Sequence, residues 1–148
     1  MDNPIISPWG FLKKEEEVIE MGYYSTLTRC DPVKVVGMTE EQFRKKWKEK
    51  IESLDDDHKG DLDFYNWLPG KKEPDCLWFE LDCEEWYAKH YADESLAEFI
   101  SQVIAEGTYC VLEFQGEDGA WWGYYITKDS VKEIKYVRMV DGKLIETT

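Results

Sequence analysis

The sequence has little positive charge and almost no histidine. Its 148 residues include 18 Lys and Arg against 32 Asp and Glu, with two His, and the formal net charge is −14. Proteins that bind nucleic acids or anionic membrane surfaces do so through clustered Lys and Arg. The composition therefore predicts neither a nucleic-acid partner nor a membrane partner. It favours a basic protein as the partner.

Long hydrophobic runs and a secretory signal are also missing. The longest apolar stretch, Ala120 to Ile126, is far shorter than the roughly 20 residues that cross a bilayer. Near the amino terminus the lysines follow a short apolar patch interrupted by two prolines, which is the reverse of a signal peptide. We therefore expect a cytoplasmic protein. No C-x-x-C pair occurs, so we expect small buried thiols at the four cysteines, which are Cys30, Cys76, Cys83 and Cys110.

Motifs of the common catalytic and phosphate-binding sites are absent. The sequence contains no G-x-S-x-G, G-x-x-x-x-G-K, G-x-G-x-x-G or H-E-x-x-H. Because His58 and His90 are the two histidines, any acid–base chemistry would fall to carboxylates. We favour a protein without catalytic activity and predict no cofactor.

Apolar and aromatic residues are plentiful. Hydrophobic residues make up 43% of the chain and aromatic residues 15%, which supplies the apolar area that a folded core needs. At this length we expect residues 1–148 to form a single domain. The negative charge is concentrated in residues 55–107, which hold 15 acidic and 4 basic side chains. An acidic segment rich in aromatic rings is the main anomaly of the sequence.

Capping boxes predict most of the helices. In this motif a Ser, Thr or Asp side chain and a Glu or Gln three residues later bond to each other's backbone N–H groups. The pairs and the helices that they predict are Thr39 with Gln42 for 40–54, Asp82 with Glu85 for 83–91, and Ser95 with Glu98 for 95–106. Residues 11–21 form either a helix or the lead-in to a strand; we favour the helix, followed by strands at 23–29 and 33–37.

From Thr108 the hydrophobic period changes to two, which is typical of strands. Turn signals divide this part into an antiparallel β-meander over about 108–146. Glycines and prolines within residues 55–74 predict a long acidic connection. The sequence therefore predicts an α+β fold, in which the meander packs with two to four helices.

The meander turn decides which side chains share a face of the sheet. With an even number of loop residues, Trp122 and Tyr124 would share a face with Val111 and Glu113, and both faces would be substantially apolar. We predict that the face of Trp122 and Tyr124 is covered, either by the amino-terminal segment, by a second copy of the chain or by a partner.

Two sequence patterns partly resemble a metal site and a catalytic pair. The string DDDHKGDLDFYN fits five positions of a calcium loop, but Lys59 stands at a ligand position and Asn66 where a bidentate Glu should close the site. Cys83 and His90, on one helix, would lie roughly 10 Å apart along its axis, too far for a catalytic pair. We predict no metal site and a packed or hydrogen-bonded imidazole at His90.

These features predict an acidic protein that binds a basic protein, in the manner of an inhibitor, an immunity protein or an antitoxin. One alternative is a small-molecule-binding domain or carboxylate-based enzyme with an aromatic-lined pocket. The other is a structural subunit that oligomerises, as a homodimer, through its sheet face. The candidate partner-binding residues are Asp55, Asp57, Asp61, Asp63, Trp67, Trp122 and Tyr124.

Overall fold

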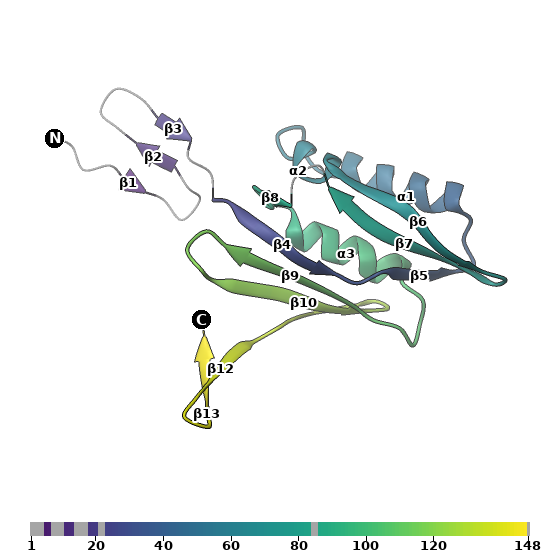
Figure 1. The fold of residues 1–148 in the computed structure, drawn as a ribbon. Helices are drawn as coiled ribbons and strands as arrows, with labels where there is room; N and C mark the ends of the chain where they lie inside the picture. The colour runs from purple at the N-terminus through teal and green to yellow at the C-terminus, as the bar shows by residue number, and fades with distance from the viewer. Residues whose placement is uncertain (1–4, 7–10, 14–17, 21–22, 84–85, 148) are drawn as a thin grey trace.

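The computed structural model describes residues 5–6, 11–13, 18–20, 23–83 and 86–147. Helices pack against antiparallel sheets, so the predicted α+β fold with a β-meander is confirmed (Figure 1). Among these residues no helix has both the length and the apolar character needed to cross a lipid bilayer.

The larger sheet contains the meander. Its five strands, in spatial order, are β11 (Ser130–Glu133), β10 (Trp121–Thr127), β9 (Cys110–Gly116), β4 (Ser25–Cys30) and β8 (Tyr87–Ala88). Every neighbouring pair is antiparallel. The last two strands of the predicted meander, β12 (Tyr136–Val140) and β13 (Lys143–Thr147), form a separate hairpin.

A second sheet has three strands. Its order is β5 (Val33–Val36), β7 (Cys76–Cys83) and β6 (Tyr65–Glu73), again antiparallel. The chain passes directly from β4 into β5 through Asp31 and Pro32, which links the two sheets (Figure 1). Three short strands, β1 (Ile5–Ile6), β2 (Phe11–Lys13) and β3 (Val18–Glu20), form a small sheet near the amino terminus.

The predicted capping box begins α1 (Glu40–Glu52). Thr39 Oγ1 accepts a hydrogen bond from the backbone N–H of Gln42, and Gln42 Oε1 accepts one from Thr39, over 3.1 and 2.9 Å. On its buried face the ring of Phe43 stacks on Phe79 of β7 with a centroid distance of 3.8 Å. This stack fixes α1 on the three-stranded sheet.

The central helix is α3 (Asp93–Val103), and six of its eleven residues are buried. On one side it contacts β10 and β11, and on the other the ring of Phe99 meets those of Phe43 and Trp47 at centroid distances of 5.5 and 4.8 Å. A helix covered on two sides must be apolar around most of its circumference. The core of the protein therefore surrounds α3.

Two predicted helices are wrong. The described residues of 83–91 contain no helix: β7 ends at Cys83, residues 87–88 form β8, and the carbonyl of Trp86 accepts a bond from the N–H of Leu27 on β4. Pairing with β4, which is distant in sequence, overrides the local capping signal. Within 11–21 the described residues form β2 and β3, which pair as a hairpin in place of the expected helix.

The acidic connection predicted for 55–74 also needs correction. Only its first part is irregular, since α2 (Gly60–Asp63) and the whole of β6 lie within it. Pro69 misled the prediction, because it sits at an irregularity in the pairing of an edge strand, where a missing N–H is tolerated. The helix expected over 95–106 begins at Asp93, and the N-cap position is Ala92 rather than Ser95.

The predicted assignment of sheet faces is wrong by one residue. Trp122 lies opposite Phe114 and Tyr124 opposite Leu112, so these four side chains share a face. This inner face packs toward α3, where Phe114 and Leu112 have no exposed surface. Trp122 and Tyr124 are therefore covered, as predicted, but chiefly by α3, which was not among the expected covers. Tyr23, from the amino-terminal segment, adds a ring contact to Trp122 with a centroid distance of 6.1 Å. The outer face carries Trp121 and Tyr125, each 43% exposed.

Candidate functional site

The structure separates the predicted partner-binding residues into two groups. Trp67 is 2% exposed and Tyr124 is 9% exposed, and Trp122 is half-buried beneath the sheet. These rings contribute to the core and present little surface to a partner. The four aspartates, by contrast, lie together on the segment that joins α1 to β6, and they are Asp55, Asp57, Asp61 and Asp63.

We call residues 55–63 the acidic loop; it holds five aspartates, one lysine and one histidine. Asp55, Asp57 and Asp63 are exposed, whereas Asp61 is half-buried. Lys59 Nζ pairs with Asp56 over 3.1 Å. Within the described residues no group of three or more His, Cys, Asp or Glu side chains is arranged to hold a metal ion. The loop therefore presents carboxylates at the surface of the protein.

A hydrogen bond organises the acidic loop. His58 Nδ1 bonds to the carboxylate of Asp55, and backbone bonds of 3.0 and 3.2 Å join the N–H groups of His58 and Lys59 to the carbonyl of Asp55. The hydrogen bond to Asp55 raises the pKa of His58. Burial raises the pKa of Asp61, and the neighbouring Asp55 charge adds to this effect. The folded turn holds these side chains at defined positions.

A pocket of about 290 Å³ lies between the acidic loop and the β8 edge of the larger sheet. It is lined by Gly60, Asp61, Phe64, Tyr24, Ala88 and Lys89. Asp61 thus lines the same pocket as two aromatic residues, one at the end of α2 and one directly before β4. A pocket lined by a carboxylate residue and aromatic residues is suited to bind an ammonium or guanidinium group.

The rings continue from this pocket along the sheet edge. Tyr24 stacks on Tyr87 with a centroid distance of 5.4 Å, and Tyr87 is 52% exposed. The Nζ atom of Lys89 lies 5.7 Å from the centroid of the Tyr24 ring. This cation–π contact, made by the protein's own lysine, is the kind of contact that a partner's Lys or Arg would make here. We call Tyr24, Phe64 and Tyr87 the aromatic edge.

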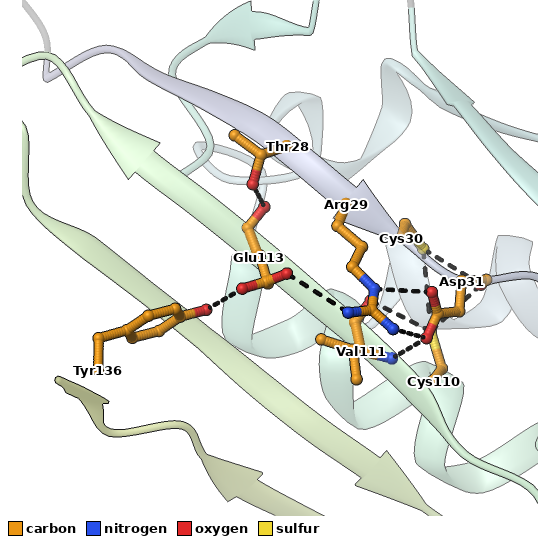
Figure 2. A network of polar contacts seen from close by, with 8 residues as sticks. All are labelled: Thr28, Arg29, Cys30, Asp31, Cys110, Val111, Glu113 and Tyr136. Atoms are coloured by element: carbon orange, nitrogen blue, oxygen red, sulfur yellow. Dashed lines mark hydrogen bonds and ion pairs between the residues drawn. The ribbon is translucent and has the colours of Figure 1, made fainter. Parts of the chain in front are cut away.

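The outer face of the sheet carries a separate polar network, which Figure 2 shows. Arg29 donates two hydrogen bonds to Asp31, over 2.9 and 3.1 Å, and its Nη1 atom lies 3.8 Å from Glu113 Oε1. Asp31 Oδ2 also accepts a bond from the N–H of Val111 over 3.0 Å. The charged groups of this network satisfy one another, and its evident role is to fasten β4 to β9.

Tyr136 completes the outer network. Its hydroxyl donates to Glu113 Oε2 over 2.7 Å (Figure 2). Burial and this bond to a carboxylate raise the pKa of Tyr136. A Cβ at position 123 would lie 2.6 Å from the Tyr136 oxygen and 2.5 Å from the Leu112 carbonyl, so glycine is required at this point of β10. The network thus anchors the start of β12.

His90, considered above as a partner of Cys83 in a catalytic pair, is 3% exposed. Its Nε2 donates to the carbonyl of Trp86 over 2.8 Å, and its Nδ1 accepts a bond from the hydroxyl of Tyr65. The predicted hydrogen-bonded imidazole is confirmed. Burial lowers the pKa of His90, which favours the neutral form of the ring. Both ring nitrogens are used in holding β6 to the segment before α3.

Sequence reasoning found the acidic loop and missed the aromatic edge. Phe64 directly follows the loop in the string DLDF, so its proximity was visible. Tyr24 and Lys89 come from segments far apart in the chain, which the pairing of β4 with β8 brings together. No local pattern in the sequence marks that pairing.

Comparison with known proteins gives no family for this chain: no protein-family model, no curated protein and no solved structure matches it.

Proposed function

We propose that this protein acts in the cytoplasm as a binding module for a basic protein, in the manner of an inhibitor, an immunity protein or an antitoxin. The docking surface of this proposal is the acidic loop together with the aromatic edge. One observation carries it: Asp61, Tyr24 and Phe64 line a single pocket.

Charge supports this choice of partner. Residues 55–107 hold 15 acidic and 4 basic side chains, and the acidic loop lies at the start of this segment. Exposed Asp55, Asp57 and Asp63 surround the pocket residue Asp61 along the same loop. Such a surface attracts a cationic partner over a distance comparable to the Debye length, about 8 Å at physiological ionic strength.

The aromatic rings add the binding energy that the aspartate charges alone do not provide. Carboxylates at the rim of an interface act mainly on the rate of encounter, whereas aromatic residues in a pocket provide most of the binding energy. An arginine of the partner would stack on Tyr24 or Phe64 and pair with Asp61. This combination distinguishes a docking surface from carboxylates that only keep a protein in solution.

A binding assay with a defined probe tests the proposal. The probe is a fluorescently labelled peptide of alternating arginine and glycine, and the readout is anisotropy at low and at physiological salt. Replacing Asp55, Asp57, Asp61 and Asp63 by Asn should weaken binding about tenfold. Replacing Tyr24 by Ala should weaken it further, because the cation then loses its ring.

A charge-matched variant provides the control. Glu41, Glu49, Glu52 and Glu106 are exposed and lie outside the loop, and changing them to Gln alters the net charge by the same amount. This control should bind the peptide within about threefold of the unaltered protein. Equal weakening in both quadruple variants would show that the peptide senses net charge alone, and the proposed surface would be rejected.

The outer sheet face supports the second candidate, a subunit that oligomerises through its sheet. Trp121 and Tyr125 are each 43% exposed there, and Tyr109, 52% exposed, stacks on Tyr125 at 5.5 Å. The two candidates make different predictions. A homodimer through this face would dissociate when Trp121 and Tyr125 are changed to Ser and would be indifferent to the aspartates of the acidic loop.

A further inference from the structure

Two thiols of the larger sheet lie side by side. The Sγ atom of Cys30, on β4, is 3.9 Å from the Sγ atom of Cys110, on β9 (Figure 2). Cys30 lies opposite Leu112 in the strand pairing, so Cys110 is its diagonal neighbour on the same face of the sheet. The two sulfurs are also 3.7 and 3.3 Å from the backbone oxygen of Asp31.

We propose that Cys30 and Cys110 form a redox-active pair that a peroxide converts to a disulfide between β4 and β9. A disulfide has an S–S length of about 2.05 Å, so the sulfurs must approach by about 1.9 Å. Diagonal neighbours on paired strands have Cα atoms about 7–8 Å apart, at the upper limit for a disulfide, so both side chains must rotate and the two strands must also move slightly closer together. This inference is independent of the proposed function, because neither thiol belongs to the acidic loop or the aromatic edge.

The reaction balances with one molecule of hydrogen peroxide. The Cys30 thiolate attacks one peroxide oxygen, the O–O bond breaks, and the products are a sulfenic acid at Cys30 and, after protonation, one water. The Cys110 thiol then attacks the sulfenic sulfur. An S–S bond forms, the S–O bond breaks, and the thiol proton leaves with the hydroxyl group as a second water. Two thiols are oxidised and one peroxide is reduced.

Exposure assigns the order of these steps. Cys30 is half-buried as a residue, whereas Cys110 has no exposed surface, so we assign the attack on the peroxide to Cys30 and the resolving step to Cys110. The hydrogen bond with Cys110, followed by burial, raises the pKa of Cys30. Because the thiolate is the nucleophile, the reaction should be slow at neutral pH and should accelerate as the pH rises.

The bond would change the protein in a measurable way. It would close a loop between residues 80 positions apart in the chain, and a disulfide across a long loop restricts the unfolded chain. It would also remove the S–H donors near the Asp31 carbonyl, at the base of the Arg29 network. We expect the urea midpoint of unfolding to rise by roughly 1 M on oxidation.

The test is oxidation of the folded full-length chain by hydrogen peroxide, followed by thiol counting, intact mass and peptide mapping. We expect the loss of two hydrogens, the loss of two of the four thiols, and a cross-linked peptide that contains Cys30 and Cys110. The initial rate should increase with pH. A dithiol reductant should restore all four thiols and the original urea midpoint.

Matched variants separate this pair from the other cysteines. Cys76 and Cys83 are buried on β7 in the other sheet, so Cys76→Ser should form the bond at an unchanged rate, whereas Cys30→Ser should form none. Mapping on the unaltered chain avoids dependence on any variant that folds poorly. A bond that includes Cys76 or Cys83, stepwise oxidation of Cys30 to a sulfinic acid without a bond, or reaction only after unfolding would each overturn the proposal.

Discussion

Trp122 Nε1 donates a hydrogen bond of 2.8 Å to Oδ2 of Asp93, which joins the inner face of the sheet to the first turn of α3. The hydroxyl of Tyr124 donates to the same oxygen over 2.7 Å. One carboxylate thus receives two donors from one strand. The negative charge also lies at the amino-terminal end of α3, where the helix dipole favours it.

We expect Asp93→Ala to destabilise the protein by about 2 to 4 kcal/mol. The change removes the acceptor for two partly buried donors, and hydrogen bonds to charged groups contribute more than neutral ones. Urea unfolding measures this loss. Glu94, exposed in the same helical turn, is the control, and Glu94→Ala should cost under about 1 kcal/mol. Equal costs at the two positions would contradict the role given to Asp93.

Adjacent tryptophans on opposite faces of β10 give a second prediction. Trp122 stacks on Phe114 at 5.5 Å beneath the sheet, whereas Trp121 is 43% exposed on the outer face. We expect Trp122→Ala to cost about 3 kcal/mol of unfolding free energy and Trp121→Ala under about 1 kcal/mol. If urea titrations showed that Trp121→Ala costs more unfolding free energy than Trp122→Ala, the assignment of the sheet faces would be wrong.

A sequence pattern predicts secondary structure correctly when the interactions that decide the structure are local in the chain. The capping box at Thr39 and Gln42 predicted α1 correctly because both partners lie within one helical turn. The equivalent pattern at Asp82 and Glu85 failed because Asp82 and Cys83 pair with β6 and residues 87–88 pair with β4, which are distant in sequence. Local chemistry decided the first case and tertiary pairing the second.

The candidate site also has a part that the sequence could predict and a part that it could not. The acidic loop could be predicted, because a run of aspartates is solvated wherever it lies on the surface. Trp67 could not be placed, since its ring is buried by Phe43 and Trp47 of α1, at centroid distances of 5.6 and 5.8 Å. Whether a tryptophan faces a partner or the core depends on contacts between elements, which a single sequence does not display.

The buried His90 predicts how stability depends on pH. Its pKa is lowered in the folded protein, so the unfolded chain, with an ordinary value near 6.5, binds the proton more readily. Stability should therefore be fully present above about pH 6.5 and fall as the pH drops toward the folded pKa. Urea titrations across this range measure the slope. A His90→Gln variant should lose the part of the pH dependence of stability that His90 contributes. An unchanged slope of stability against pH would contradict the assignment of this dependence to His90.

His58 should titrate in the opposite direction. Its hydrogen bond to Asp55 raises its pKa, so its contribution to stability is present below about pH 6.5 and is lost as the pH rises through the folded value. Two-dimensional NMR of the imidazole protons should show His58 titrating above His90. Asp55→Asn should return the pKa of His58 toward 6.5 and leave that of His90 unchanged.

Kinetics with a purified partner should report the role of the acidic loop. Changing Asp55, Asp57, Asp61 and Asp63 to Asn should slow association more than it speeds dissociation, because charges at the rim of an interface act on encounter. Stopped-flow mixing at low salt measures both rates. If the association rate is the same with the unaltered loop and the Asn loop, the carboxylates do not steer the partner.

The most direct test of the proposed function is affinity capture from the native host, run in parallel with three forms of the protein. These are the unaltered chain, the loop variant with the four aspartates changed to Asn, and the control with Glu41, Glu49, Glu52 and Glu106 changed to Gln. We predict that the unaltered chain and the control retain the same basic protein, that high salt releases it, and that the loop variant does not retain it. Recovery of the same proteins with all three forms, or of no basic protein with any of them, would contradict the proposed function.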